Sequence, residues 1–162
     1  MHDYHYSARV SQIADLEESI RGSRLRVGKN SVIDYFAKIK FVGGIGDIAL
    51  GDNCYVNSGS VIYSGDGVSI GDNSLNSPNV VIAATNHEFA DSKTLIPLQG
   101  LKQTPTGIVI GKDVWISSGS IILNNTIIED GCVVAAKPTI IGSLRNNCVY
   151  TGNPLRVIGQ RF

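Results

Sequence analysis

The sequence has no excess of charge of either sign and no long hydrophobic run. Fourteen basic and fourteen acidic side chains give a formal net charge of zero, so we expect no general electrostatic attraction to nucleic acid or to an anionic membrane. No uninterrupted apolar stretch approaches the roughly 18 residues of a membrane span, and the opening segment MHDYHYSARVSQ lacks the apolar core of a signal peptide. These absences predict a soluble, cytoplasmic protein with no membrane span and no nucleic-acid partner.

Cysteine and histidine, the usual ligands of transition metals, are also scarce. The three cysteines, Cys54, Cys132 and Cys148, are widely spaced and form no CxxC pattern, so the sequence indicates neither a disulfide framework nor a zinc site. Histidine also occurs only three times. We therefore expect no metal and interpret the cysteines as small core residues.

Isoleucine, valine and glycine are abundant, with 20, 15 and 18 residues respectively in a chain of 162. Aromatic residues make up only 7%. β-Branched residues favour strands and glycine favours turns, so this composition is typical of an all-β, turn-rich protein. The length is that of one domain, and we expect residues 1–162 to form a single one.

A six-residue repeat organises these residues. Read from Ile110, the chain divides into the blocks IGKDVW, ISSGSI, ILNNTI, IEDGCV and VAAKPT, each opened by an aliphatic residue. The same phase appears upstream in LGDNCY, VNSGSV and IYSGDG from Leu50, and in IGDNSL, NSPNVV and IAATNH from Ile70. A period of six matches neither the 3.6 of a helix nor the 2 of a sheet face. It indicates a solenoid.

The period suits a chain that forms a short strand, turns a corner and repeats. Three such sides make one coil of 18 residues, which is the separation of Ile110 and Ile128. The aliphatic residue then points inward, the small fifth residue packs at the corner, and Gly, Asn and Asp provide turn conformations. Successive coils stack at about 4.8 Å through parallel backbone hydrogen bonds. The sequence therefore predicts an all-β fold, a parallel β-helix of triangular section.

Two insertions interrupt the repeat. Two residues are added near 65–67, and 22 extra residues lie between His87 and Ile110. A loop this long inside a tight repeat is usually functional or disordered. Because it follows directly after His87, we expect a functional inserted loop over 88–109. The repeat is looser near the N-terminus, and we place the start of the solenoid after an N-terminal tail over 1–9.

The blocks, with TNHEF before the loop, GKDVWISSGSIIL after it and TGNPLRVI near the end, resemble the hexapeptide-repeat acyltransferases. Within that family the chain is most similar to the bacterial sugar and polysaccharide O-acetyltransferases, a group that includes galactoside and maltose acetyltransferases. The resemblance implies a left-handed coil, against the usual right-handed crossover rule. It also implies a homotrimer with active sites between subunits, and acetyl-CoA as the co-substrate.

His87 is the candidate general base. A sugar hydroxyl is a poor nucleophile until its proton is taken as it attacks, and an imidazole that titrates near neutral pH suits this step. The other two histidines, His2 and His5, lie in the expected tail. From the residues alone, an exposed loop histidine without a catalytic role is an equally good interpretation. The match of NHE to the family motif favours catalysis.

The resemblance also indicates four residues on the acceptor side. Asn57 matches the family's acceptor-site asparagine, and Tyr55 matches a further acceptor contact more weakly; a corner asparagine that satisfies the backbone is the alternative for Asn57. Trp115, the single tryptophan, matches a residue at the thioester end of the pocket, with packing at a subunit interface as the alternative. Glu88 is placed either to orient the imidazole, to contact the sugar, or simply to be solvated.

One departure from the galactoside enzymes concerns the acceptor. Where those enzymes have a second acceptor-binding carboxylate, this chain has Gly65, with Asp66 beside it. A galactoside is therefore a doubtful substrate.

The coenzyme site is expected on one face of the stack. Ser118 and Ala136 match positions that contact acetyl-CoA in the galactoside enzymes, and their separation of 18 residues places one above the other. Small residues on that ladder allow the pantetheine arm to approach the backbone, and arginine suits phosphate geometry. The expected coenzyme-binding residues are Ser118, Gly119, Ala135, Ala136, Lys137 and Arg156.

The leading hypothesis is an acetyl-CoA-dependent O-acetyltransferase that acts on a saccharide, a bacterial surface-polysaccharide unit or its precursor. An N-acetyltransferase of an amino sugar or an antibiotic is the alternative enzyme. A zinc site like that of carbonic anhydrase needs about three histidine ligands, and only one histidine lies outside the tail. A structural or ice-binding β-helix would show a flat threonine ladder and no long loop, the reverse of this chain.

Overall fold

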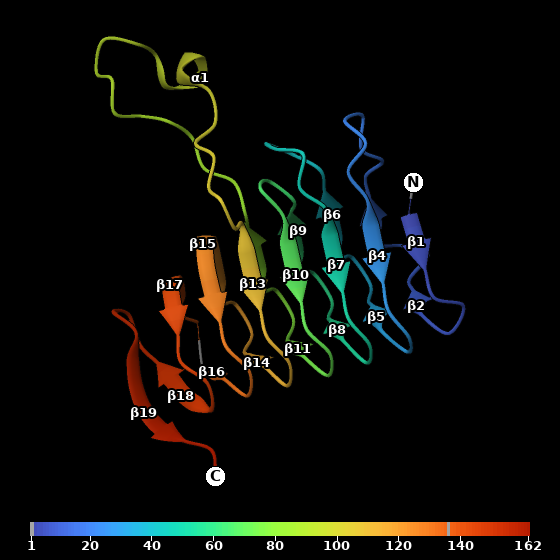
Figure 1. The fold of residues 1–162 in the computed structure, drawn as a ribbon. Coiled ribbons are helices and arrows are strands. Elements are labelled where there is room, and N and C mark those ends of the chain that lie inside the picture. Colours follow the sequence, from blue (N-terminus) through green and yellow to red (C-terminus); the bar gives the residue numbers. More distant parts are fainter. Residues whose placement is uncertain (1, 136) are drawn as a thin grey trace.

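The chain winds into a solenoid of short parallel strands, shown in Figure 1. The structure is a computed structural model that describes residues 2–135 and 137–162. Each coil except the last contributes one strand to each of three faces, and backbone hydrogen bonds join every described coil to the next. The chain therefore forms the predicted left-handed parallel β-helix.

We name the three faces A, B and C in the order in which the chain visits them. Two strands, β15 and β17, are long enough to pass from face C to face A. Face A contains β1 (His2–Tyr4), β4 (Leu25–Val27), β7 (Ile48–Leu50), β10 (Val68–Ile70) and β13 (Ile108–Ile110). Face B contains β2 (Arg9–Val10), β5 (Val32–Ile33), β8 (Tyr55–Val56), β11 (Leu75–Asn76), β14 (Trp115–Ile116), β16 (Val133–Ala135), β18 (Cys148–Thr151) and the antiparallel β19 (Arg156–Gln160). Face C contains β3 (Asp15–Leu16), β6 (Lys38–Lys40), β9 (Val61–Tyr63), β12 (Val81–Ala83) and the first halves of β15 (Ile121–Ile128) and β17 (Thr139–Leu144).

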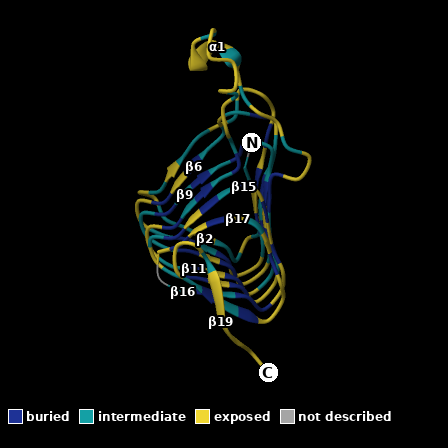
Figure 2. Cartoon of the chain, turned by 90° about the vertical axis from the view of Figure 1, so that its left-hand side faces the viewer, coloured by how far each residue is buried: buried dark blue, intermediate teal, exposed yellow. Residues whose placement is uncertain are grey.

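The core is a set of aliphatic ladders that run along the inside of the faces. Ile39, Ile62 and Ile82 lie in register on successive coils of face C, and each is at most 1% exposed. Figure 2 shows the buried residues, in dark blue, recurring along the strands of successive coils. Burial of these side chains supplies the main stabilisation, at about 25 cal/mol for each Å² of apolar surface removed from water. The inward position of the opening aliphatic residue is confirmed.

The corners carry the small and the turn-forming residues. Cys54, Cys132 and Cys148 are all buried and free, which confirms them as core residues. Asn30, Asn53 and other corner residues adopt positive φ, a conformation that asparagine tolerates well. The amide of Asn30 donates to Asn53 at 3.2 Å across one coil step.

The N-terminal residues correct one expectation. Residues 2–10 are not a tail, because β1 pairs with β4 and β2 pairs with β5 in the same parallel register as the rest of the stack. His2 is in register with Leu25, 23 residues later. The first two coils are longer than 18 residues because of extra residues at their corners. Those additions hide the six-residue phase, so the sequence pattern placed the start of the solenoid too late.

The long insertion is a projecting loop over 84–107, which Figure 1 shows extending away from the coils. Its two limbs pair as antiparallel backbone, since His87 bridges Leu101 and Lys102 N–H donates to Asn86 O at 2.9 Å. The short helix α1 (Ile96–Gln99) lies near its tip. The structure contains the expected inserted loop, but the predicted bounds of 88–109 are corrected at both ends. The loop already begins after β12 (Val81–Ala83), so His87 lies within it, and Ile108–Ile110 forms β13.

Within the described residues, no helix is long and apolar enough to cross a bilayer.

Candidate functional site

His87 lies at the foot of the projecting loop, close to where it leaves face C. Its backbone N–H donates to the side chain of Asn86 at 2.9 Å, and its bridge to Leu101 fixes the backbone on both sides. The residue is exposed, and no hydrogen bond or ion pair to another described residue engages the imidazole. The ring is therefore available to a substrate hydroxyl, as a general base requires.

Glu88 follows on the same limb and is half-buried. Its backbone N–H donates to Gly100 O at 3.1 Å, which extends the pairing of the two limbs. In the described part of the chain, no contact joins its carboxylate to the imidazole of His87. The backbone of Glu88 therefore takes part in the pairing of the two limbs, but its carboxylate does not orient the imidazole of His87.

Tyr55 lies on face B, and Asn57 lies at the corner that follows this face. Asn57 Nδ2 donates to Asn76 O at 2.8 Å, so one amide hydrogen stabilises the next coil, as the corner interpretation expects. None of the described residues donates to its Oδ1, which stays available to a ligand. Tyr55 points outward and is 40% exposed.

Trp115 also points outward from face B, with 48% of its surface exposed. Its indole N–H donates to Ser77 Oγ at 3.1 Å, which holds the ring against the preceding coil. Trp115 lines a cavity of about 420 Å³ together with Leu75, Val133 and Arg161. An exposed indole beside a cavity is the arrangement expected of a ring that a ligand or a second subunit covers.

The coenzyme candidates fall into two groups. Ser118 and Gly119 form the corner after β14, and Lys137 lies directly above them, because a Cβ added to Gly119 would be 3.2 Å from Lys137 Cγ. Gly119 has φ of 72°, a conformation that favours glycine. Ala135 ends β16 on the same side. Ala136 lies outside the described residues.

Arg156 lies further toward the C-terminal end of the stack. It begins β19, is exposed, and pairs with Thr151 of β18. Three candidates therefore share one corner, and Arg156 lies two strands beyond Ala135, because Thr151 pairs with both of them. This arrangement suits an elongated ligand with an anionic end.

His87 and Asn57 are not brought together within one chain. Asn57 lies at the B–C corner, the turns that follow the face B strands, whereas His87 lies at the C–A corner, the turns that follow the face C strands. The full width of face C separates them, roughly 15–20 Å at about 3.3 Å per strand residue. A general base needs hydrogen-bond reach of its target. A site that uses both residues is therefore incomplete in a single chain.

Two functional candidates escaped the sequence reasoning. Asp34 follows β5 as Asn57 follows β8, and its carboxylate accepts a hydrogen bond from Ser58 Oγ. This bond, with the Tyr35 backbone N–H, lowers the pKa of Asp34 below its usual value. Asp34 lies 23 residues before Asn57. Because 23 is not a multiple of six, the repeat did not predict that the two residues occupy equivalent positions on neighbouring coils.

The second candidate is a hydrogen-bond network at the base of the loop, made by Asp66, Thr104 and Asn124. Asp66 Oδ2 accepts hydrogen bonds from Thr104 N at 2.6 Å, Thr104 Oγ1 at 2.9 Å and Asn124 Nδ2 at 2.9 Å. Asn124 is only 7% exposed. The two-residue insertion near 65–67 was the available sequence signal for this feature.

Sequence comparison identifies relatives among acetyltransferases, although no protein-family model matches the chain. WcaF of Escherichia coli, described as a colanic acid biosynthesis acetyltransferase, is 30% identical over 136 residues, which cover 84% of this chain and 69% of WcaF. The galactoside O-acetyltransferase of Escherichia coli is 29% identical over 160 residues, covering 99% and 75% of the two chains. The protein YJL218W of Saccharomyces cerevisiae, described as an acetyltransferase, is 38% identical over 112 residues; the match covers 69% of this chain and 55% of the yeast protein.

Solved structures with the same fold include two acyltransferases. A single-residue mutant of AntD, an N-acyltransferase from Bacillus cereus in complex with dTDP-4-amino-4,6-dideoxyglucose and coenzyme A, has a TM-score of 0.81 at 26% identity, covering 99% of this chain and 84% of AntD. A galactoside acetyltransferase in complex with coenzyme A has a TM-score of 0.63 at 29% identity, covering 76% and 64%. Both similarities extend over most of the solenoid.

Proposed function

Because the chain belongs to the hexapeptide-repeat acetyltransferases, we propose that it transfers an acetyl group from acetyl-CoA to a hydroxyl of a saccharide, a unit of a bacterial surface polysaccharide or its precursor. The observation that carries the proposal is the free, exposed imidazole of His87 at the foot of the inserted loop. The similarity to WcaF and to galactoside O-acetyltransferase supports a carbohydrate acceptor.

His87 acts as the general base in this reaction. Its imidazole accepts the proton of the attacking hydroxyl while the hydroxyl oxygen forms a bond to the carbonyl carbon of the acetyl thioester. The carbon–sulfur bond then breaks, and the imidazolium returns the proton to the departing thiolate. The products are an acetyl ester and the free thiol of coenzyme A, so no further acid or base is required.

The acetyl donor lies along the corner formed by Ser118, Gly119 and Lys137. The absence of a side chain on Gly119 lets the pantetheine arm approach the backbone. Lys137 and Arg156 supply positive charge for the phosphates, and Ala135 continues the small-residue ladder. Trp115 covers the thioester end of the arm on face B, which also contains Tyr55 and is followed by the corner that carries Asn57.

The complete site lies between two copies of the chain in a homotrimer. The separation of His87 from Asn57 by the width of face C supports this arrangement, because one chain does not bring the base to the acceptor amide. The loop of one subunit then delivers His87 to the face B side of its neighbour. Glu88 enters the same interface and contacts the acceptor.

Acetylation of an amine is the second candidate, favoured by the similarity to AntD, which was solved with an amino-sugar nucleotide. The two functions differ in the product bond. An ester is cleaved by mild alkali and an amide is not, so alkaline treatment of the isolated product distinguishes them.

The decisive experiment incubates the protein and acetyl-CoA with a panel of sugars, oligosaccharides and amino sugars, and follows thiol release and product mass. We expect an alkali-labile acetyl-saccharide from the native protein and a loss of about 10²- to 10⁴-fold in the folded His87→Ala variant. Full activity in that variant would remove His87 from the mechanism. Transfer to amines alone would replace the proposed function by N-acetylation.

A further inference from the structure

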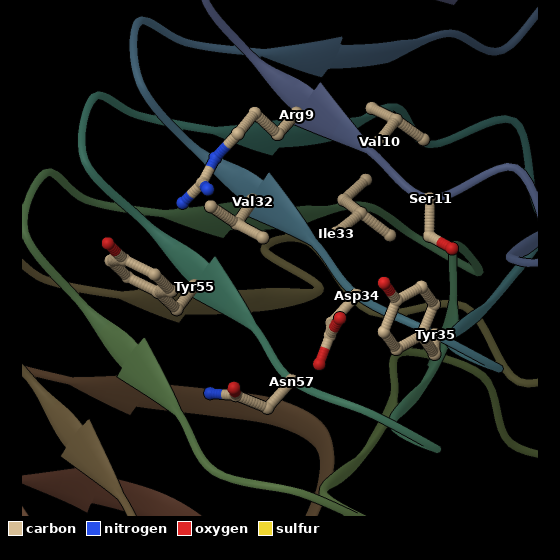
Figure 3. Close-up of a pocket in the computed structure, with 9 residues that line it drawn as sticks. All are labelled: Arg9, Val10, Ser11, Val32, Ile33, Asp34, Tyr35, Tyr55 and Asn57. Carbon is tan, nitrogen blue, oxygen red and sulfur yellow. The ribbon is translucent and has the colours of Figure 1, made fainter.

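A polar cavity lies beside the candidate acceptor residues, on the three coils nearest the N-terminus. Its volume is about 360 Å³, and Figure 3 shows the side chains that line it. It begins at Tyr55 and Asn57 and extends across β5 to β2. The sequence pattern did not place this region near the acceptor, because it assigned the first residues to a tail.

The cavity is built on a regular column of polar residues. Ser11, Asp34 and Asn57 each follow a face B strand, and their backbone N–H groups donate to the next coil at 2.9, 2.9 and 3.1 Å. Their side chains are therefore stacked at the coil spacing of about 4.8 Å. A ligand that contacts Asn57 and extends along the column meets Asp34 next.

The groups in the cavity are those that bind sugar hydroxyls. The carboxylate of Asp34 is oriented by the Ser58 hydroxyl, and Arg9 is exposed and forms no salt bridge with any described residue. A carboxylate accepts hydrogen bonds from two hydroxyls and a guanidinium donates to two, and both bonds are strengthened by charge. One cation and one anion leave the cavity without net charge, which favours a neutral ligand rich in hydroxyls over a phosphate.

Two aromatic rings complete the cavity. Tyr55 is 40% exposed and Tyr35 is 57% exposed, and Figure 3 shows them on opposite sides of Asp34. Exposed rings of this kind are costly to leave in water and offer a flat apolar surface with a polar hydroxyl. The C–H face of a pyranose ring is complementary to such a surface.

From these observations we propose that the cavity is a second acceptor subsite, which binds the neutral sugar residue adjoining the one that is acetylated. The proposal rests on the saccharide acetyltransferase function given above and extends it: the acceptor is an oligosaccharide rather than a free monosaccharide. Asp34 and Arg9 bind hydroxyls of the adjoining residue, and Tyr35 contacts its ring.

The test compares acceptors that share one terminal sugar and differ in length, from monosaccharide to trisaccharide. We expect kcat/KM to rise about tenfold from the monosaccharide to the disaccharide, which is the effect of one or two charge-assisted hydrogen bonds. Asp34→Ala and Arg9→Ala should each remove most of this rise. Arg9 is the safer substitution for folding, because no described hydrogen bond or ion pair uses its guanidinium. Asp3→Asn, an exposed carboxylate on face A, is the matched control and should leave the rise intact.

Each outcome separates the subsite from the function on which it rests. Equal kcat/KM for all lengths, or a uniform loss in the Asp34→Ala and Arg9→Ala variants at every length, would overturn the subsite and leave saccharide acetylation standing. A rise that requires a charged second sugar would overturn the choice of a neutral ligand. Absence of transfer to every saccharide would overturn the proposed function itself, and the subsite with it.

Discussion

The Asp66 carboxylate accepts two hydrogen bonds from Thr104, one of 2.6 Å from its backbone N–H and one of 2.9 Å from its hydroxyl. These bonds join the C–A corner, where Asp66 lies, to the returning limb of the projecting loop. Two residues before Thr104, Lys102 pairs with Asn86, the neighbour of His87. The network therefore fixes the loop at its base, and through the paired limbs it holds the backbone of the candidate base.

Substitution Asp66→Ala should release the base of the loop. It leaves the donors of Thr104 and Asn124 without their shared acceptor, at a cost of about 1–3 kcal/mol in the free energy of unfolding. Displacement of His87 should lower kcat about ten- to hundredfold. The KM for acetyl-CoA should stay unchanged, because the coenzyme corner, formed by Ser118, Gly119 and Lys137, lies elsewhere. Steady-state kinetics and thermal unfolding measure both effects.

Thr106→Val is the matched control for that experiment, since Thr106 lies on the same limb and, among the described residues, its hydroxyl forms a hydrogen bond only with Asn125, at 3.4 Å. A raised KM for the saccharide with normal kcat in Asp66→Ala would contradict the loop role. It would instead make Asp66 a ligand of the acceptor.

A mixture of two inactive variants tests the shared site. If His87 of one subunit serves Asn57 of its neighbour, then trimers formed from equal amounts of His87→Ala and Asn57→Ala contain intact sites at about a quarter of their interfaces. Activity should therefore return to about a quarter of the native value after the variants are unfolded and refolded together. Each variant refolded alone is the control. A mixture no more active than its components would show that both residues act within one chain.

Trp115 should report coenzyme binding directly. It is the single tryptophan and is 48% exposed, so covering it with acetyl-CoA should change the intensity of its fluorescence and shift its emission to shorter wavelength. A titration then gives the Kd. Gly119→Ala should weaken binding about tenfold or more, because the added Cβ enters the coenzyme corner at 3.2 Å from Lys137 Cγ.

Gly22→Ala provides the comparison for Gly119→Ala. Gly22 also has positive φ, of 88°, but a Cβ there would meet nothing within 4 Å. Any general effect of alanine at positive φ should appear in both variants. Equal Kd values in the two would place the coenzyme away from Gly119.

Alkaline pH should destabilise the fold through the buried thiols. Burial raises the pKa of Cys132 from 9.0 to about 11, so the folded state keeps a proton that the unfolded state loses. The contribution of this group to stability is complete below about pH 9 and is lost as the pH rises to about 11, by roughly 1.4 kcal/mol per unit. Denaturant unfolding of the native protein and of Cys132→Ala between pH 8 and 11 measures the difference. A pH dependence of the same slope in both proteins would assign the effect to other groups.

The six-residue period predicted most of the fold because it fixes which side chains point inward. Ile110, Ile116, Ile122 and Ile128 are all at most 2% exposed, as the first position of each block requires. The outward position of Trp115 and the place of the inserted loop follow from the same phase. These properties are local to a block, so a single sequence contains them.

Only the tertiary structure determined which corners carry the candidate residues and which of them meet. Stacked residues are 16 to 40 positions apart along the chain, and the number changes whenever a corner gains or loses residues. For this reason β1 and β2 looked like a tail, and Asp34 was not recognised beneath Asn57. The hydrogen bonds of Asp66 to Thr104 and the separation of His87 from Asn57 by a whole face depend on the closure of each coil. Each coil closes only when its three sides and its corners are combined, and a repeat of six residues describes a single side.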